Sequence, residues 1–268
     1  MGIIIAVLNR KGGTGKTTTA VTLAQGMASK LREQGSTEDR VMLIDLDPQS
    51  NCAPALGVEQ NDADLSYLIL RRQTLRDAII QARPSLFLIP SSDKLTSAVT
   101  RLSKLEVLAD EFETPVAVND VLQTYLGQLA DRCACMILDC PPSLGQLERA
   151  VFQFATHIVI PATPKYLGTV GVARLTRNIL DYNQTATSKL KLLAIVPTQF
   201  DKRRLLDREM LADLQSAYGQ AVVEPIPFAI KAAEAPSFGQ TVLEYAPSSK
   251  PAQAYQKLVE HVYQEVKV

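Results

Sequence analysis

The stretch LNRKGGTGKTTTA, residues 8–20, joins a short apolar run at Ile3–Leu8 to a segment of helical spacing at Thr17–Leu31. Its glycines free the backbone to turn several amides toward one point, which suits the oxygens of a phosphate group. These glycines are Gly12, Gly13 and Gly15. A phosphate-binding loop needs an apolar strand before it and a helix after it, and both are present here. The stretch therefore predicts an α/β fold that binds a nucleotide at the start of its first helix.

The loop departs at one position from the usual pattern, G-x-x-x-x-G-K-[ST]. That pattern would end here on Gly15, Lys16 and Thr17, and it requires a glycine where this chain has Arg10. By residue type, Lys16 is predicted to reach the terminal phosphates, Thr17 to place its hydroxyl on Mg²⁺, and Thr18 to offer a further hydroxyl or amide. A glycine-rich turn without a ligand is the alternative. The coincidence of strand, loop, Lys-Thr pair and helix favours nucleotide binding.

Short apolar runs alternate with segments of helical spacing along the whole chain. The runs lack polar alternation and are predicted to be buried strands: Ile3–Leu8, Val41–Ile44, Leu86–Ile89, Cys135–Leu138, Ile158–Ile160, Leu192–Val196 and Val222–Val223. The segments between them are predicted helices: Thr17–Leu31, Leu65–Gln81, Val118–Ala130, Val172–Tyr182 and Leu205–Tyr218. Because strand, helix and strand repeat in this order, we expect right-handed crossovers and a largely parallel sheet.

Composition is typical of a compact cytoplasmic protein. Hydrophobic residues make up 46% and charged residues 21%, so a sizeable core can form. The 28 basic and 28 acidic residues balance, so nucleic acid could be bound only through a local basic patch. The residues after Met1 lack the basic start and the small-residue cleavage site of a signal peptide, so we expect no export. The apolar runs are much shorter than the roughly 18 residues of a membrane-spanning helix. The four cysteines match no zinc or disulfide spacing and are predicted to be reduced core residues.

One domain, residues 1–268, is expected because the chain shows no linker, repeat or low-complexity segment. The first predicted strand begins at residue 3, which leaves no room before it for a DNA-reading helix-turn-helix domain. We therefore expect no sequence-specific operator binding.

Carboxylates stand at the carboxyl ends of two predicted strands, where α/β sheets hold their ligands. Asp45 and Asp47 follow VMLI, and Asp139 follows CMIL. Asp139 is a candidate for holding Mg²⁺, and Asp47 for orienting or deprotonating the attacking water. The alternative is that these aspartates begin loops or cap helices. Their combination with Lys16 and Thr17 favours a nucleotide site.

Four stretches carry a family resemblance, in the family's own order: KGGTGKTT (11–18), LIDLDPQSN (43–51), ILDCPPSLG (137–145) and AEAPSFGQTVLEYAPSS (233–249). Together they resemble the ParA branch of the ParA/MinD deviant Walker A ATPases, with matches from residue 3 to about residue 260. The resemblance implies a P-loop NTPase fold, with a twisted, mainly parallel sheet and helices on both faces. It also implies that ATP and Mg²⁺ are bound and that ATP is hydrolysed to ADP and phosphate.

Lys11 matches the extra lysine of the family's motif, which reaches the other subunit's nucleotide in an ATP-bound homodimer. Phosphoryl transfer gathers negative charge on the γ-phosphate, and a cation supplied in trans stabilises that charge. The residues themselves leave two alternatives open, in which Lys11 is a solvated loop charge or serves its own subunit's phosphates.

The resemblance also assigns roles to other residues. Asp47 matches the water-positioning aspartate, Asp45 the aspartate near Mg²⁺, and Asp139 the Walker B carboxylate. Pro227, in IPFAIK, matches a position beside the adenine. The implied catalytic residues are Lys11, Lys16 and Asp47. The implied ATP-binding residues are Lys11, Gly12, Gly13, Thr14, Gly15, Lys16, Thr17, Thr18 and Pro227, and the implied metal site contains Thr17, Asp45 and Asp139.

ParA relatives bind DNA without sequence preference when they are dimeric. Here the implied contacts are Arg203 and Arg204, in DKRRLLDR (201–208), together with Lys231. The family's PRNVR reads PFAIK in this chain, so Phe228 replaces a customary arginine. A solvated charged helix is the alternative for 201–208. Lys165 is either a second interface cation or a surface lysine.

The resemblance implies a cytoplasmic, nucleoid-associated ATPase that segregates or positions a plasmid, a chromosome or a large protein assembly. Its expected partners are DNA and a ParB-like or cargo-adaptor protein that stimulates hydrolysis. The alternative is a MinD-like ATPase that positions its cargo at a membrane through an amphipathic tail. The tail KPAQAYQKLVEHVYQEVKV (250–268) has helical spacing but mixes acidic and basic residues on its polar side. We therefore expect it to pack on the protein's own body.

Overall fold

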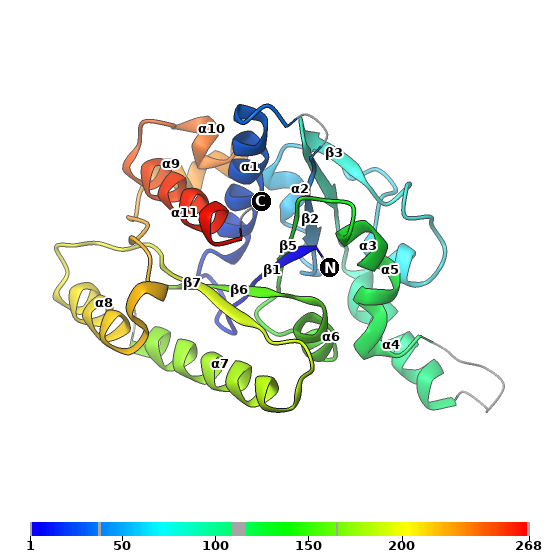
Figure 1. The fold of residues 1–268 in the computed structure, drawn as a ribbon. Helices are drawn as coiled ribbons and strands as arrows, with labels where there is room; N and C mark the ends of the chain where they lie inside the picture. Colours follow the sequence, from blue (N-terminus) through cyan, green and yellow to red (C-terminus); the bar gives the residue numbers. More distant parts are fainter. Residues whose placement is uncertain (1, 37–38, 109–115, 165, 267–268) are drawn as a thin grey trace.

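The computed structural model describes residues 2–36, 39–108, 116–164 and 166–266. Its named strands are β1 (Ile3–Val7), β2 (Val41–Asp45), β3 (Ile80–Arg83), β4 (Leu86–Ile89), β5 (Cys135–Asp139), β6 (His157–Ala162) and β7 (Lys191–Pro197). They form one sheet in the order β3-β4-β2-β5-β1-β6-β7 (Figure 1). β3 is antiparallel to β4, and the other neighbouring strands are parallel. The predicted α/β fold with a mainly parallel sheet is confirmed.

The strands are apolar without alternation because both faces of the sheet are covered. In β1, Ile4 and Ala6 belong to one cluster of buried side chains, and Ile5 and Val7 belong to another. This division follows from the period of two along a strand. The central strands β2 and β5 are buried at every position. The sheet therefore separates two hydrophobic cores.

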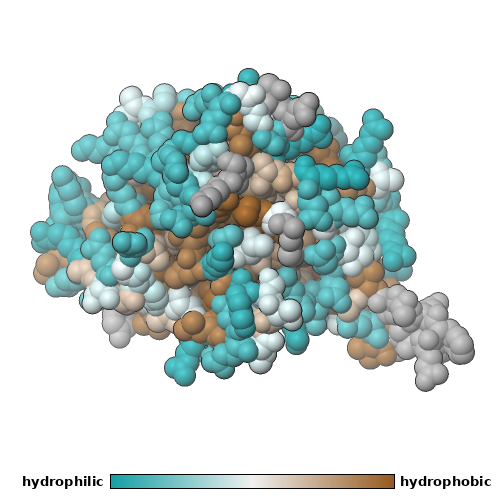
Figure 2. All heavy atoms as spheres, in the orientation of Figure 1, coloured by the Kyte–Doolittle hydropathy of each residue, from teal (hydrophilic) through white to brown (hydrophobic). Residues whose placement is uncertain are grey.

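Helices close both cores, as Figure 1 shows. The core that contains Ile5 is covered by α1 (Lys16–Glu33), α2 (Cys52–Ala55), α9 (Ile230–Glu234), α10 (Val242–Tyr245) and α11 (Lys250–Val266). The short η3 (Ala235–Phe238) contacts α2 and α9. The core that contains Ile4 is covered by α3 (Leu65–Ile69), α4 (Lys94–Leu108), η1 (Val118–Asp120), α5 (Val121–Ala130), α6 (Leu147–Phe154), α7 (Tyr166–Thr185) and α8 (Leu205–Tyr218). The short η2 (Gly219–Ala221) follows α8 and has no buried residue. Hydrophilic residues cover most of the face seen in Figure 2. The expected helices on both faces are confirmed.

The C-terminal helix α11 lies beside α1, red against blue in Figure 1. Its apolar side is buried in the shared core, and the Tyr255 hydroxyl lies 3.2 Å from Thr19 Oγ1. At the rim, Lys30 of α1 forms an ion pair with Glu260 of α11. The expectation that this tail packs on the protein's own body is confirmed. None of the described helices has the length and hydropathy of a membrane-spanning segment.

Two predicted elements were wrong. The helix expected at Leu65–Gln81 is α3 followed by turns and β3, because Arg71 adopts a φ of 55° that ends the helix. The expected strand Val222–Val223 makes only an isolated bridge, between Val222 and Ile195. Lys165 lies outside the described residues.

Candidate functional site

The loop between β1 and α1 has a backbone conformation that depends on glycine, and it leaves free space at two of its glycines. Gly13 and Gly15 have φ values of 70° and 80°, in the left-handed region that glycine adopts without strain. A Cβ atom added to Gly12 or Gly13 would meet no heavy atom within 4 Å. Arg10, in contrast, is not among the residues of positive φ. The position where the usual pattern has glycine therefore needs none in this loop.

The cations of the loop make different contacts. Arg10 forms an ion pair with Glu148 of α6. Lys16 is buried, and its Nζ donates to the Lys11 carbonyl at 3.1 Å. Burial lowers the pKa of Lys16, while the charges of Asp139 and Asp47 oppose that shift.

The Asn9 side chain holds the start of the loop in place, because it both accepts and donates a hydrogen bond. The Lys11 amide donates to Asn9 Oδ1 at 2.9 Å, and Asn9 Nδ2 donates to the Pro161 carbonyl of β6 at 2.7 Å. The loop is thus anchored to the strand next to β1. No pattern in the sequence singled out Asn9.

The segment after β7 supports the other side of the loop. Thr198 Oγ1 donates to the Thr14 carbonyl at 2.8 Å, and Gln199 Nε2 donates to the Gly13 carbonyl at 2.9 Å. Pro227 forms a bridge with Phe200, so it lies beside this supporting segment. The sequence reading missed Thr198 and Gln199, although they directly follow a strand that was predicted and therefore stand at the ligand edge of the sheet.

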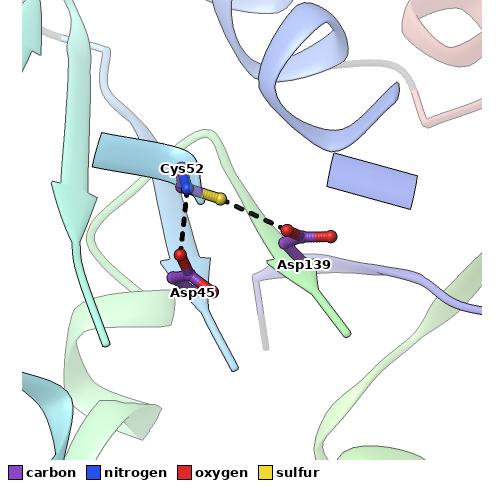
Figure 3. Close-up of side chains that lie close together, drawn as sticks. All are labelled: Asp45, Cys52 and Asp139. Atoms are coloured by element: carbon purple, nitrogen blue, oxygen red, sulfur yellow. Dashed lines mark hydrogen bonds between the residues drawn. The ribbon is translucent and has the colours of Figure 1, made fainter. Parts of the chain in front are cut away.

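Asp45 and Asp139 end neighbouring strands and are register partners, and both side chains are buried. Cys52 links them, as Figure 3 shows: its amide donates to Asp45 Oδ2 at 3.1 Å, and its Sγ donates to Asp139 Oδ2 at 3.3 Å. Asp139 Oδ1 is buried without a hydrogen-bond partner. The structure brings together the two strand-end carboxylates that the sequence singled out. It adds Cys52, which the sequence reading missed.

Burial raises the pKa of both carboxyl groups. The pKa of Asp139 rises to about 8, through burial first and then the nearby charge of Asp45. Burial also raises the pKa of Asp45 to about 6, against the hydrogen bonds donated by Asp47 and Cys52. A bound cation would favour the ionised form of both groups.

A hard divalent cation fits this donor set. Mg²⁺ prefers oxygen ligands, and it usually keeps several waters while contacting one or two carboxylates and substrate phosphates. The unsatisfied buried Oδ1 of Asp139 is the kind of atom that a cation or its bound water would satisfy. The Thr17 side chain lies beside the Asp139 carboxyl group, whose pKa it lowers against the effect of burial. Thr17, Asp45 and Asp139 are therefore the residues that could hold Mg²⁺ here.

Asp47 stands two residues beyond Asp45 and is only partly buried. Its amide donates to Asp45 Oδ1 at 2.9 Å, and its own Oδ1 accepts from the Gln49 amide at 3.0 Å. The backbone is thus fixed on both sides of Asp47, while the carboxylate stays accessible. This arrangement suits a group that contacts a water molecule.

A cavity of about 450 Å³ adjoins the start of α1. Thr17, Thr18 and Thr22 line it from α1, and Gln240 and Thr241 line it from the segment before α10. Pro227 does not line this cavity. Thr18 therefore stands between the phosphate loop and a partly polar cavity.

The basic residues proposed for DNA lie on two segments. Arg203 and Arg204 precede α8 and are 84% and 69% exposed, and Arg203 donates to both oxygens of Asp201 at 2.9 and 2.8 Å. This contact lowers the pKa of Asp201 to about 2. Lys231 is exposed on α9, and Phe228, which replaces the customary arginine, is 65% exposed.

A backbone hydrogen bond joins the segment before Lys231 to the segment before Arg203. The Phe228 amide donates to the Phe200 carbonyl at 3.0 Å, one residue before Asp201. The segment that leads to Lys231 therefore adjoins the segment that leads to Arg203.

Comparisons with known proteins agree with the predicted resemblance. The family described as "AAA domain" matches residues 2–192. The chromosome-partitioning ATPase Soj of Thermus thermophilus is 33% identical over 263 residues, which are 98% of this chain and 96% of that protein.

Solved structures share the fold over the whole chain. Cobyrinic acid a,c-diamide synthase from Mycobacterium smegmatis, solved with bound ADP and magnesium, is 28% identical with a TM-score of 0.77, covering 100% of this chain and 96% of that chain. The cell division ATPase MinD of Pyrococcus furiosus is 21% identical with a TM-score of 0.77, covering 99% and 100%, and shows the fold alone. The extent of the family match and the identity to Soj establish that this chain belongs to the ParA-type family of partition ATPases.

Proposed function

We propose that this chain dimerises with ATP, binds DNA without sequence preference, and segregates or positions a cargo with a partner protein that stimulates hydrolysis. As a member of its family it is an ATPase that uses ATP and Mg²⁺. The cargo is a plasmid, a chromosome or a large protein assembly, and the partner is a ParB-like protein or a cargo adaptor. The protein acts on the nucleoid in the cytoplasm. The name of the Thermus relative, a chromosome-partitioning ATPase, supports this assignment.

The state of Lys11 is the observation that carries the proposal. Arg10 is paired within its own chain, and Lys16 is bonded to the loop itself. Within the described part of the chain, the Lys11 ammonium has no hydrogen-bond or ion-pair partner. A lysine in a phosphate loop that has no partner in its own subunit suits a charge that is supplied to the nucleotide of a second copy.

The residues of one subunit would hold and orient the nucleotide. Amides of the glycine-rich loop would cradle the phosphates, Lys16 would contact the terminal oxygens, and Thr17, Asp45 and Asp139 would hold Mg²⁺. Mg²⁺ neutralises charge on the phosphate oxygens during transfer. Asp47 would orient the attacking water, and Pro227 would lie beside the adenine.

Arg203, Arg204 and Lys231 would contact DNA phosphates. The balanced net charge supports a local patch, because the molecule as a whole has no field that attracts a polyanion. The exposure of both arginines and the adjoining backbone of the two segments support a single patch.

Co-sedimentation tests the proposal against the membrane alternative. The protein is spun with DNA and, separately, with anionic vesicles, each with ATP and with ADP. We expect pelleting with DNA only in ATP, and binding that weakens steeply as salt is raised. The double variant Arg203→Ala, Arg204→Ala should weaken DNA binding and flatten its salt dependence, because each lost phosphate contact reduces the slope by about 1. DNA binding that is independent of salt, or ATP-dependent pelleting with vesicles alone, would contradict the proposal.

A further inference from the structure

Cys52 lies between the two carboxylates of the proposed Mg²⁺ site, and its sulfur is not the kind of ligand atom that Mg²⁺ prefers. Its amide and its thiol contact different carboxylates, Asp45 and Asp139, and it is fully buried between them. One ligand atom from each of the three residues lies within 4.8 Å of the other two. In Figure 3 the thiol of Cys52 points toward the Asp139 carboxylate, between the ends of β2 and β5. The cluster therefore contains a sulfur donor in addition to the oxygens.

The spacing of these donors is close to that of a tetrahedral metal site. With Zn–S near 2.3 Å and Zn–O near 2.0–2.2 Å, ligand atoms in such a site stand roughly 3.5 Å apart. Cys52 Sγ and Asp139 Oδ2 are 3.3 Å apart. Asp139 Oδ1, buried and without a partner, offers a second oxygen of the same carboxylate. Because the three ligand atoms lie within 4.8 Å of one another, a shift of about 1 Å in the side chains would bring them around one ion.

The chemistry of the donors separates two classes of metal. Mg²⁺ takes oxygen ligands in octahedral geometry, so the thiol adds nothing to its binding. Thiolate and carboxylate together suit softer ions that accept four ligands, such as Zn²⁺ and Co²⁺.

We propose that Asp45, Cys52 and Asp139 bind a thiophilic divalent cation of the Zn²⁺ class in the nucleotide-free protein. On binding, Cys52 releases its thiol proton to solvent, its hydrogen bond to Asp139 is replaced by a sulfur–metal bond, and both carboxylates ligate the same ion. The inference rests on the proposed metal roles of Asp45 and Asp139. Because Mg²⁺ needs the same carboxylates, the two ions exclude each other, and a bound Zn²⁺ holds the ATPase inactive.

Cobalt provides the test, because a thiolate–Co²⁺ bond absorbs in the near ultraviolet. Nucleotide-free protein is titrated with Co²⁺, and we expect a charge-transfer band that Zn²⁺ abolishes. Cys52→Ser should lose the band and bind Co²⁺ at least about 10–100-fold more weakly, because the loss of a ligand costs no less than the loss of a hydrogen-bond partner of a ligand. Cys140→Ser is the matched control, because Cys140 is equally buried but donates to the Leu138 carbonyl, and its band should remain. A band that persists in Cys52→Ser would overturn the proposal.

X-ray absorption of the Zn²⁺-loaded natural protein does not depend on the folding of any variant. We expect one sulfur among the zinc ligands, and a shell of oxygen and nitrogen alone would also overturn the proposal. Neither measurement uses ATP or DNA. If dimerisation or DNA binding fails while the cobalt band is present, the proposed function is wrong and the metal inference stands. If the protein dimerises and binds DNA but gives no cobalt band, the metal inference is wrong and the proposed function stands.

Discussion

The role of each residue in the phosphate loop depends on which groups its side chain contacts. Arg10 and Lys11 are adjacent cations in the sequence, but only Arg10 is paired within the described chain. Local pattern could not distinguish them, because the pairing depends on Glu148, which is 138 positions away. The distinction predicts that two neighbouring charge deletions will have different effects.

Replacing Lys11 by alanine should reduce ATP-dependent dimer formation and lower turnover by roughly 10²–10³-fold, the usual effect of removing one group that stabilises transition-state charge. Light scattering with ATP measures the dimer, and phosphate release measures turnover. Arg10→Ala is the control and should still dimerise, because its charge is paired inside the subunit. Normal dimerisation of Lys11→Ala would show that this lysine does not act across the interface.

Replacing Asp47 by alanine should slow hydrolysis by about 10²–10⁴-fold, as expected for loss of a residue that orients or deprotonates the attacking water. Nucleotide should still bind, because the hydrogen bonds of Asp47 are within its own turn and only its charge acts on Lys16 of the phosphate loop. The variant should therefore accumulate as an ATP-bound dimer in size-exclusion chromatography. Phosphate release at the natural rate would remove Asp47 from the mechanism.

Among the secondary-structure elements, α1 and α11 pack closely against each other in the core that contains Ile5. A Cβ on Gly26 of α1 would lie 2.4 Å from Val259 Cγ2 of α11, a branched side chain that cannot easily move away. A Cβ on Gly127 of α5 would also lie 2.4 Å from a neighbour, but there the neighbour is the flexible end of Gln123. Both glycines are in helices, so alanine improves helix propensity equally at each.

The pair Gly26→Ala and Gly127→Ala isolates the cost of the close helix contact. Because the propensity gain cancels in the comparison, Gly26→Ala should be less stable than Gly127→Ala by about 1–3 kcal/mol, the usual cost of overpacking a core. Urea denaturation followed by circular dichroism measures both free energies of unfolding. Equal stability of the two variants would mean that α11 can shift away from α1 without cost.

For the whole molecule, the buried carboxylates link stability to pH. Folding raises the pKa of Asp139 from 3.8 to about 8, so ionising this group works against folding. The cost is absent below pH 3.8, grows as the pH rises, and is complete above about 8. Burying Asp139 therefore lowers the free energy of unfolding of the metal-free protein at neutral and higher pH.

The variant Asp139→Asn, which cannot ionise, should gain stability relative to the natural protein as the pH rises from 5 to about 8.5. Chemical denaturation in the presence of a chelator, at several pH values, measures the difference. Adding Mg²⁺ and ADP should stabilise the natural protein more than the variant, because a ligand stabilises the state that binds it and the variant lacks one metal-binding carboxylate. A stability difference that does not change with pH would show that Asp139 is ionised throughout.

Sequence alone determined the features that are encoded by neighbours along the chain. The glycines and the Lys-Thr pair of residues 12–17, the unbroken apolar strands, and the helices after them each follow from local spacing, and together they predicted the parallel sheet and the phosphate loop. Strand ends also located Asp45 and Asp139, because parallel strands place their carboxyl ends at one edge. The error at Leu65–Gln81 has the same origin, because an apolar spacing of three and four continued past Arg71, where the backbone turns.

Only the tertiary structure decided which distant groups meet. Thr198 contacts Thr14 across 184 positions, and the thiol of Cys52 contacts Asp139 across 87. Neither contact leaves a local pattern, because hydrogen bonds between strand ends depend on the order of strands in the sheet and not on spacing along the chain. The glycine-rich loop could therefore be predicted from residues 8–20. The groups that support it, and the sulfur beside the two strand-end carboxylates, depend on the arrangement of β2, β5, β1 and β7 in the sheet.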